Sequence, residues 1–107
     1  MAVTALLMNA GTAYAGPLDN ATAVFQRGDY VTTVAILRPL AAQGKADAQH
    51  FLAGIYAEGK GVAQDEVIAA KWYRLAAAQG KAAAQYDLGS MYDQWQAVAQ
   101  DYEEAIK

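Results

Sequence analysis

Apolar and polar residues alternate along most of the chain with the three-to-four spacing of amphipathic helices. In the stretch 46–58 the apolar positions are 48, 51, 52, 55 and 56, which would form one buried stripe. Asp65 stands where a helix N-cap is expected, and Gly44 and Gly80 stand where helices should end. The pattern predicts helices over 18–26, 30–43, 46–58 and 66–79, a further helix from 82, and no strand.

These helices recur with a period of 36 residues. The string Ala-Ala-Gln-Gly-Lys-Ala occupies 41–46 and returns at 77–82. The same shift relates Asp29 to Asp65 and Asp101, and Tyr56 to Tyr92. We therefore predict an all-α fold in which antiparallel helical hairpins stack as an α-solenoid. It should comprise an N-terminal capping hairpin over 18–45, a full repeat over 46–81 and an incomplete second repeat over 82–107.

The first fifteen residues differ in composition from the rest. Residues 1–15 carry no charge and end in Ala13-Tyr14-Ala15, the small-x-small pattern of a signal-peptidase site, directly before Gly16-Pro17. The apolar stretch is shorter than a membrane-spanning helix. We predict a signal peptide and a periplasmic or secreted protein. No Lys or Arg precedes Arg27, so the alternative is an N-terminal extension on a cytoplasmic protein, or a true start that lies upstream.

The composition excludes several classes of function. An apolar fraction of 55% is ample for a packed core, and a net charge of −3 with singly placed basic residues makes nucleic acid a poor partner. With no cysteine, thiolate catalysis and cysteine-ligated zinc are excluded. His50 is the only histidine, so no histidine pair exists to bind a metal or to activate a nucleophile. We predict no enzymatic activity and no cofactor.

One repeat carries a recognisable set of residues. It comprises Ala48-Gln49 with Leu52 and Tyr56, then Gly59-x-Gly61-Val62-x-Gln64-Asp65, then Ala70-Lys71-Trp72-Tyr73-Arg74-x-Ala76-Ala77-x-Gln79-Gly80. This pattern resembles the Sel-1-like repeat, a relative of the tetratricopeptide repeat, and the N-terminal stretch looks like the opening hairpin of exported bacterial members. The resemblance implies a protein-protein scaffold or regulatory adaptor of the bacterial cell envelope, whose partner is another protein or peptide.

Two other functions remain open. Some exported members of the wider family are associated with β-lactam binding or hydrolysis, but those are rich in cysteine and this chain has none. A peripheral membrane protein held by an uncleaved N-terminus is the third hypothesis.

The second repeat departs from the family pattern. Trp95 and Ala97 stand where the loop glycines are expected, so that loop should not follow the family's backbone path. The chain also stops at Lys107, before the next alanine-rich helix. We therefore expect a fragment whose last hairpin is mobile and which is marginally stable or self-associates.

The candidate partner-binding residues lie on the first helix of each repeat, mostly off its core stripe, because this helix lines the inner face of such arrays. They are Asp47, His50, Phe51, Asp87 and Ser90, with Trp95 added as a possible aromatic anchor. Phe51 is the strongest hot-spot candidate if it is exposed. For His50 a partly buried packing role is favoured, and for Trp95 packing against the hairpin is favoured over projection toward a partner.

Overall fold

The computed structural model describes residues 16–105, which form five helices and no strand. The helices are α3 (Pro17–Gln26), α4 (Tyr30–Ala42), α5 (Ala46–Glu58), α6 (Glu66–Ala78) and α7 (Ala82–Ala105). The predicted all-α repeat fold is confirmed. The first four helices match the predicted ranges to within one residue at each end. The predicted signal peptide, 1–15, lies outside the described residues.

Aspartates 36 residues apart cap the second helix of each hairpin, α4 and α6. Asp29 Oδ1 accepts from the Thr32 backbone N–H at 3.1 Å, and Asp65 Oδ1 accepts from the Ile68 N–H at 3.0 Å. Each carboxylate satisfies a donor that the first helical turn leaves unpaired. The hydrogen bonds from Thr32 hold the pKa of Asp29 below its usual value, with a smaller contribution from the charge of Arg27.

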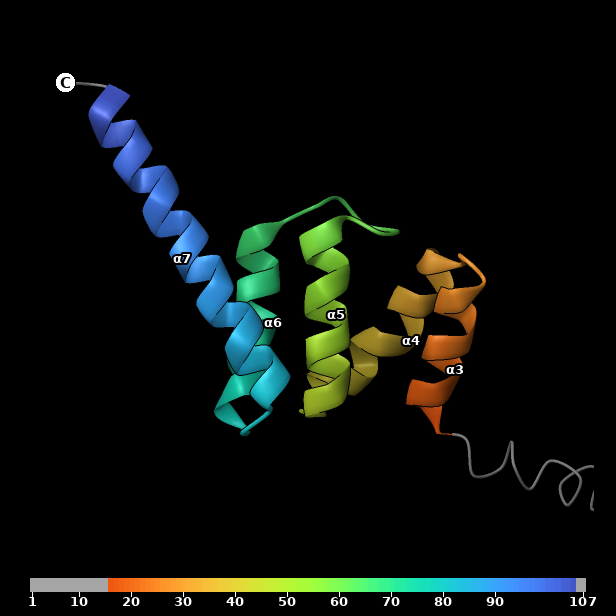
Figure 1. Cartoon of the computed structure of the whole chain (residues 1–107). Coiled ribbons are helices and arrows are strands. Elements are labelled where there is room, and N and C mark those ends of the chain that lie inside the picture. The colour runs from red at the N-terminus through yellow and green to blue at the C-terminus, as the bar shows by residue number, and fades with distance from the viewer. Residues whose placement is uncertain (1–15, 106–107) are drawn as a thin grey trace, which may run out of the picture.

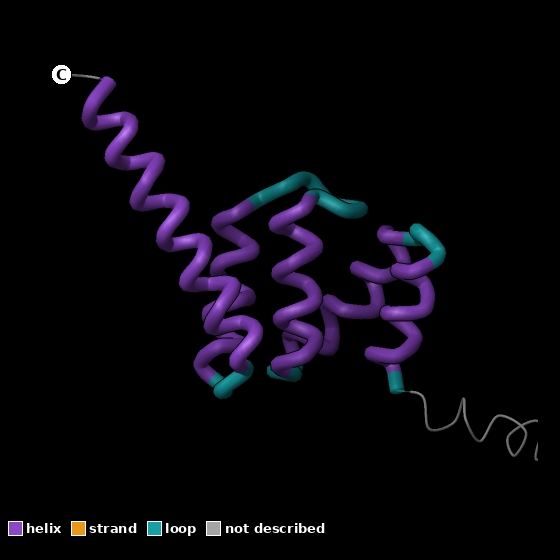
Figure 2. The backbone as a smooth tube through the Cα atoms, in the orientation of Figure 1, coloured by secondary structure: helices purple, strands orange, loops and turns teal. Residues whose placement is uncertain are grey.

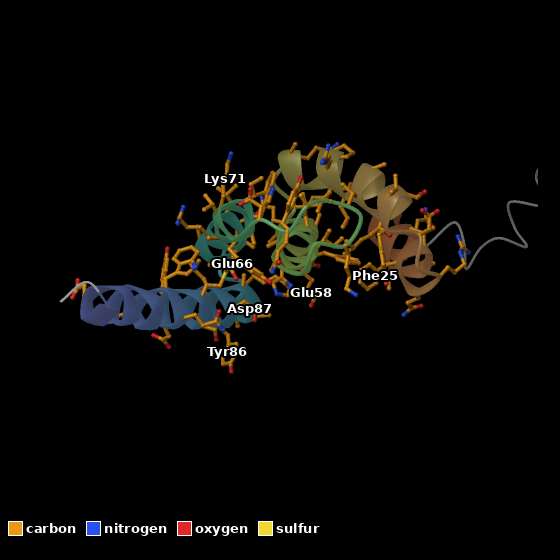
Figure 3. The ribbon with its side chains drawn as sticks, turned by 90° about the horizontal axis from the view of Figure 1, so that it is seen from above. Phe25, Glu58, Glu66, Lys71, Tyr86 and Asp87 are labelled. Atoms are coloured by element: carbon orange, nitrogen blue, oxygen red, sulfur yellow. The ribbon has the colours of Figure 1, made fainter. Side chains whose placement is uncertain are left out.

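The helices pack in sequence order as stacked antiparallel hairpins. The pairs α3–α4 and α5–α6 are hairpins, and α7 packs on α6 (Figure 1). The turns within hairpins lie at one end of the array and the turns between hairpins at the other (Figure 2). Viewed from above, α3, α5 and α7 form one face and α4 and α6 form the other (Figure 3). We call the first face the A face, because it is built from the first helix of each hairpin.

The core consists of two clusters that meet at α5. The first joins α3, α4 and α5 around Leu37 and Leu52, neither of which is exposed. The second joins α5, α6 and α7, and five of its seven members are alanines. Small side chains allow helix axes to approach closely, so the alanine-rich repeat packs with few large fillers. Tyr56 and Trp72 contact both clusters and connect them.

Two polar contacts recur at the repeat period. Arg38 donates to the Tyr56 hydroxyl at 3.0 Å, and Arg74 donates to the Tyr92 hydroxyl at 3.3 Å. The side-chain amides of the two glutamines at 49 and 85 likewise donate to the carbonyls of residues 41 and 77, at 3.1 and 3.2 Å. Each contact joins the second helix of one hairpin to the first helix of the next, so these bonds set the register of the stack.

The loop between α5 and α6 packs back against the first hairpin. Gly61 has φ +74°, a left-handed conformation that glycine adopts without strain. A Cβ added at Gly61 would lie 2.8 Å from both the carbonyl carbon and the Cβ of Tyr30. Glycine is therefore required here both by the backbone conformation and by the close approach of the two hairpins.

The second repeat has no loop where the family pattern places one. Instead α7 continues as one helix through Trp95 to Ala105, so the expected final hairpin is not formed within the described residues. No Gly or Pro follows Gly89 in this helix, and alanine and glutamate favour helix, so nothing in the local sequence terminates it. Beyond its contact with α6 the helix extends away from the array (Figure 1).

Candidate partner-binding groove

An open groove of about 450 Å³ lies on the A face. Side chains of α3, α5 and α7 form most of its lining, and Tyr73 reaches it from α6. The lining residues are Leu18, Thr22, Phe25, Asp47, His50, Phe51, Gly54, Ile55, Glu58, Tyr73, Lys81 and Asp87. Figure 3 shows Phe25, Glu58 and Asp87 on this face and Lys71 on the opposite one.

The part of the groove near α3 is apolar. Phe25 of α3 and Phe51 of α5 meet edge to face, with ring centroids 5.3 Å apart. Leu18 and Ile55 complete the apolar lining. Phe51 is half-buried and packs against the first core cluster, so it contributes one side of its ring to the groove and does not project from it.

The part near α7 is polar. His50 Nε2 and Asp87 Oδ2 are 2.8 Å apart, joining α5 to α7, and Lys81 Nζ lies 3.0 Å from Asp47 Oδ1. Tyr73 stacks obliquely on His50, with ring centroids 5.6 Å apart. Burial, and then the negative charges of Asp87 and Glu58, raise the pKa of Tyr73 to about 12. Its phenol is therefore neutral at physiological pH.

Gly54 lines the groove and has no side chain to fill it. It lies in α5, and an added Cβ would come within 3.6 Å of the Tyr73 hydroxyl, an ordinary contact distance. Tyr73 is only 7% exposed, and its hydroxyl makes no hydrogen bond with other residues in the range 16–105. A polar atom so placed is available to a molecule that enters the groove beside Gly54.

The structure brings together four of the six candidate residues. Asp47, His50, Phe51 and Asp87 all line the groove, and His50 is partly buried, whereas Ser90 is half-buried on α7 outside the lining.

Trp95 also lies apart from the groove. Its Nε1 donates to Glu66 Oε2 at 3.3 Å, and its ring packs edge-on against Tyr92. The hydrogen bond joins α7 to α6, and the Trp95 ring also packs against the second core cluster.

Sequence reasoning missed several lining residues. Tyr73 is named only as part of the family pattern, and its ring is buried, but the residue also lines the groove on the A face. Phe25 belongs to the shorter terminal hairpin, which has no exact repeat counterpart for comparison. The only signal available was its spacing of seven residues from Leu18, which places the two apolar side chains on the same face of α3.

Residues 16–105 contain neither a metal-binding cluster nor a helix that could span a membrane. No group of three or more His, Asp or Glu side chains is arranged there to hold a metal ion. None of the helices in the described part of the chain has the length and apolarity needed to span a bilayer.

The stacked hairpins and the A-face groove define a helical-repeat protein of the α-solenoid class. The Sel1 repeat family matches residues 46–81 and 82–107, more than half of the chain, and the protein belongs to this family. Sel1 repeats generally mediate protein-protein interaction and are typically non-catalytic. No curated protein and no solved structure gives a significant match to the chain.

Proposed function

We propose that the protein is a non-catalytic adaptor that binds a segment of a partner protein in the A-face groove. The observation that carries this proposal is the convergence of three successive first helices on one open groove with an apolar part and a polar part. Apolar side chains supply the contact area of a binding site, and a few polar groups fix the orientation of the ligand. Because the groove is open and is lined from three successive helices, an extended or helical segment of a partner protein could lie along it.

Gly54 allows this proposal to be tested without removing a core contact. Gly54→Leu places a side chain in the groove beside Tyr73, and its Cβ meets only an ordinary contact. Gly89→Leu is the matched control, because Gly89 is also inside a helix, is exposed and has no atom within 4 Å of its Cβ position. Both variants should remain folded by circular dichroism.

The assay is capture from a cell-envelope extract, quantified by mass spectrometry on the three immobilised chains. A protein retained by the parent and by Gly89→Leu, but lost with Gly54→Leu, would support groove binding. Equal retention by all three chains would contradict it, since a filled groove would then have no effect.

We further propose that the protein acts in the bacterial envelope, in the periplasm or outside the cell. Support comes from the sequence 1–15 alone, with its uncharged apolar stretch and Ala13-Tyr14-Ala15. Cell fractionation with N-terminal sequencing tests this. A chain that begins at Gly16 in the soluble periplasmic fraction would support export, and an intact Met1 chain confined to the cytoplasm would refute it.

A further inference from the structure

Charge is divided unequally between the two faces of the array. The first helices α3, α5 and α7 contain eight Asp or Glu residues and no Lys or Arg. The second helices α4 and α6 contain three basic residues and one acidic residue. A net charge of −3 for the whole chain conceals this division. The first helices therefore carry the acidic charge of the array and no basic residue of their own.

The groove keeps this negative character after its internal ion pairs are counted. Asp47 is neutralised by Lys81, and Asp87 is bonded to His50, which is neutral when unprotonated. Glu58 is 64% exposed at its side chain, and its Oε1 lies 3.8 Å from Lys60 Nζ, so this ion pair is loose and solvated. The groove lining thus carries three carboxylates against one lysine. Asp87 and Glu58 lie near enough to Tyr73 for their charges to add to the effect of burial in raising the pKa of its phenol.

The Tyr73 hydroxyl is a hydrogen-bond donor whose proton is not taken up by another residue of the groove lining. Its neutral hydroxyl is available to donate to a carbonyl oxygen beside Gly54. A peptide backbone presents such an oxygen at every residue. A segment that runs from the Phe25–Phe51 end toward Asp87 would therefore find, in order, an apolar surface, a backbone donor and carboxylates.

On this basis we propose that the groove selects a partner segment in which an apolar or aromatic residue is followed or preceded closely by lysine or arginine. This inference rests on the proposed function. The apolar side chain lies on Phe25 and Phe51, and the cation lies near Glu58 and Asp87. An acidic segment would be repelled by the excess of carboxylates over cations in the lining, and a neutral one would gain no attraction from that excess.

The test is selection of a randomised phage-displayed dodecapeptide library on the full 107-residue chain, with Gly54→Leu as the counter-screen. Peptides lost with Gly54→Leu and enriched in Lys or Arg near an aromatic or aliphatic residue would support the inference. Gly54-dependent peptides that are neutral or acidic would overturn it and leave groove binding standing. If no selected peptide depends on Gly54, the proposed function fails as well.

Neutralising the carboxylates then measures their share of the affinity. Glu58→Gln and Asp87→Asn retain shape and hydrogen-bonding capacity, and the asparagine can still accept from His50. Each should weaken binding of a selected basic peptide by about fivefold, the upper range for partly exposed ion pairs. Asp93→Asn, an equal charge change on α7 outside the groove, should change it less than about twofold. Equal effects at all three positions, measured by fluorescence anisotropy, would refute a specific role for Glu58 and Asp87.

Discussion

Substitution of Gly61 by alanine should be among the most damaging single changes in the chain. At its φ of +74°, a residue with a Cβ is disfavoured by about 1–2 kcal/mol. Alanine offsets about 0.4–1 kcal/mol of this cost, because it restricts the unfolded chain more than glycine does. The added Cβ would also lie 2.8 Å from two carbon atoms of Tyr30, one of them a backbone atom that cannot rotate away. Overpacking of this kind adds about 1–3 kcal/mol.

We therefore expect Gly61→Ala to lower the free energy of unfolding by about 2–4 kcal/mol. That is a large share of the roughly 5–13 kcal/mol typical of about 90 ordered residues. The melting temperature should fall by more than about 10 °C, because about 1 kcal/mol corresponds to about 4–8 °C in a domain of this size. Urea and thermal unfolding followed by circular dichroism measure both quantities.

Gly28→Ala and Gly80→Ala separate the two causes. Both glycines have positive φ, +84° and +91°, and neither has any atom within 4 Å of its Cβ position. Each should therefore lose only about 1 kcal/mol, the conformational part. If Gly61→Ala were no more destabilising than these two variants, the loop would not rest on Tyr30 as described, and the argument for close hairpin packing would be wrong.

Three further outcomes are expected. Gln49→Ala should lower the free energy of unfolding by about 1–2 kcal/mol, because it removes buried hydrogen bonds to the Ala41 carbonyl and Gln79. The repeat-equivalent Gln85→Ala changes an exposed site and should lower it by less than about 0.5 kcal/mol, as measured by urea unfolding. In an alkaline titration followed by tyrosinate absorbance, one phenol should ionise near pH 12, and this ionisation should be absent from Tyr73→Phe. Since the folded pKa of Tyr73 is raised from 10.0, its contribution to stability is complete below pH 10 and is lost as pH rises toward 12, which pH-dependent melting should show. Gly54→Ala and Gly89→Ala should each stabilise their helices by about 0.5–1 kcal/mol, and thermal melts that fall instead would contradict the open Cβ positions.

The helical array could be predicted because its signals are local and repeated. Asp29 and Asp65 cap helices 36 residues apart, and each cap is visible as an aspartate before an apolar-periodic stretch. The alanines and other apolar residues of each helix fall on one side, and this is the side that packs against neighbouring helices. Repetition of the same string at 41–46 and 77–82 fixes which helices are equivalent, so the stacking order follows without knowledge of any long-range contact.

The continuation of α7 was harder to predict, because the repeat period and the local helix propensity disagree there. The period places a loop at 95–100, and Asp101 is equivalent to the capping Asp65. Helices commonly end at a glycine with positive φ, however, and without one near Trp95 ending the helix there would cost conformational free energy. Trp95 also gains contacts with Tyr92 and Glu66 only while the helix persists. Local propensity therefore prevails over the repeat pattern.

The composition of the groove depends on contacts that no single repeat contains. His50 points to the following first helix and meets Asp87, whereas Phe51 points to the preceding one and meets Phe25. Positions 51 and 87 are equivalent, yet one is aromatic and the other acidic, so the groove changes from apolar to negative along the array. Tyr86, the equivalent of His50, is 75% exposed and points away from the hairpins (Figure 3). The lining of the groove is therefore set by the order in which different repeats are stacked, and exchanging Phe51 and Asp87 would alter the groove without altering the composition of the chain.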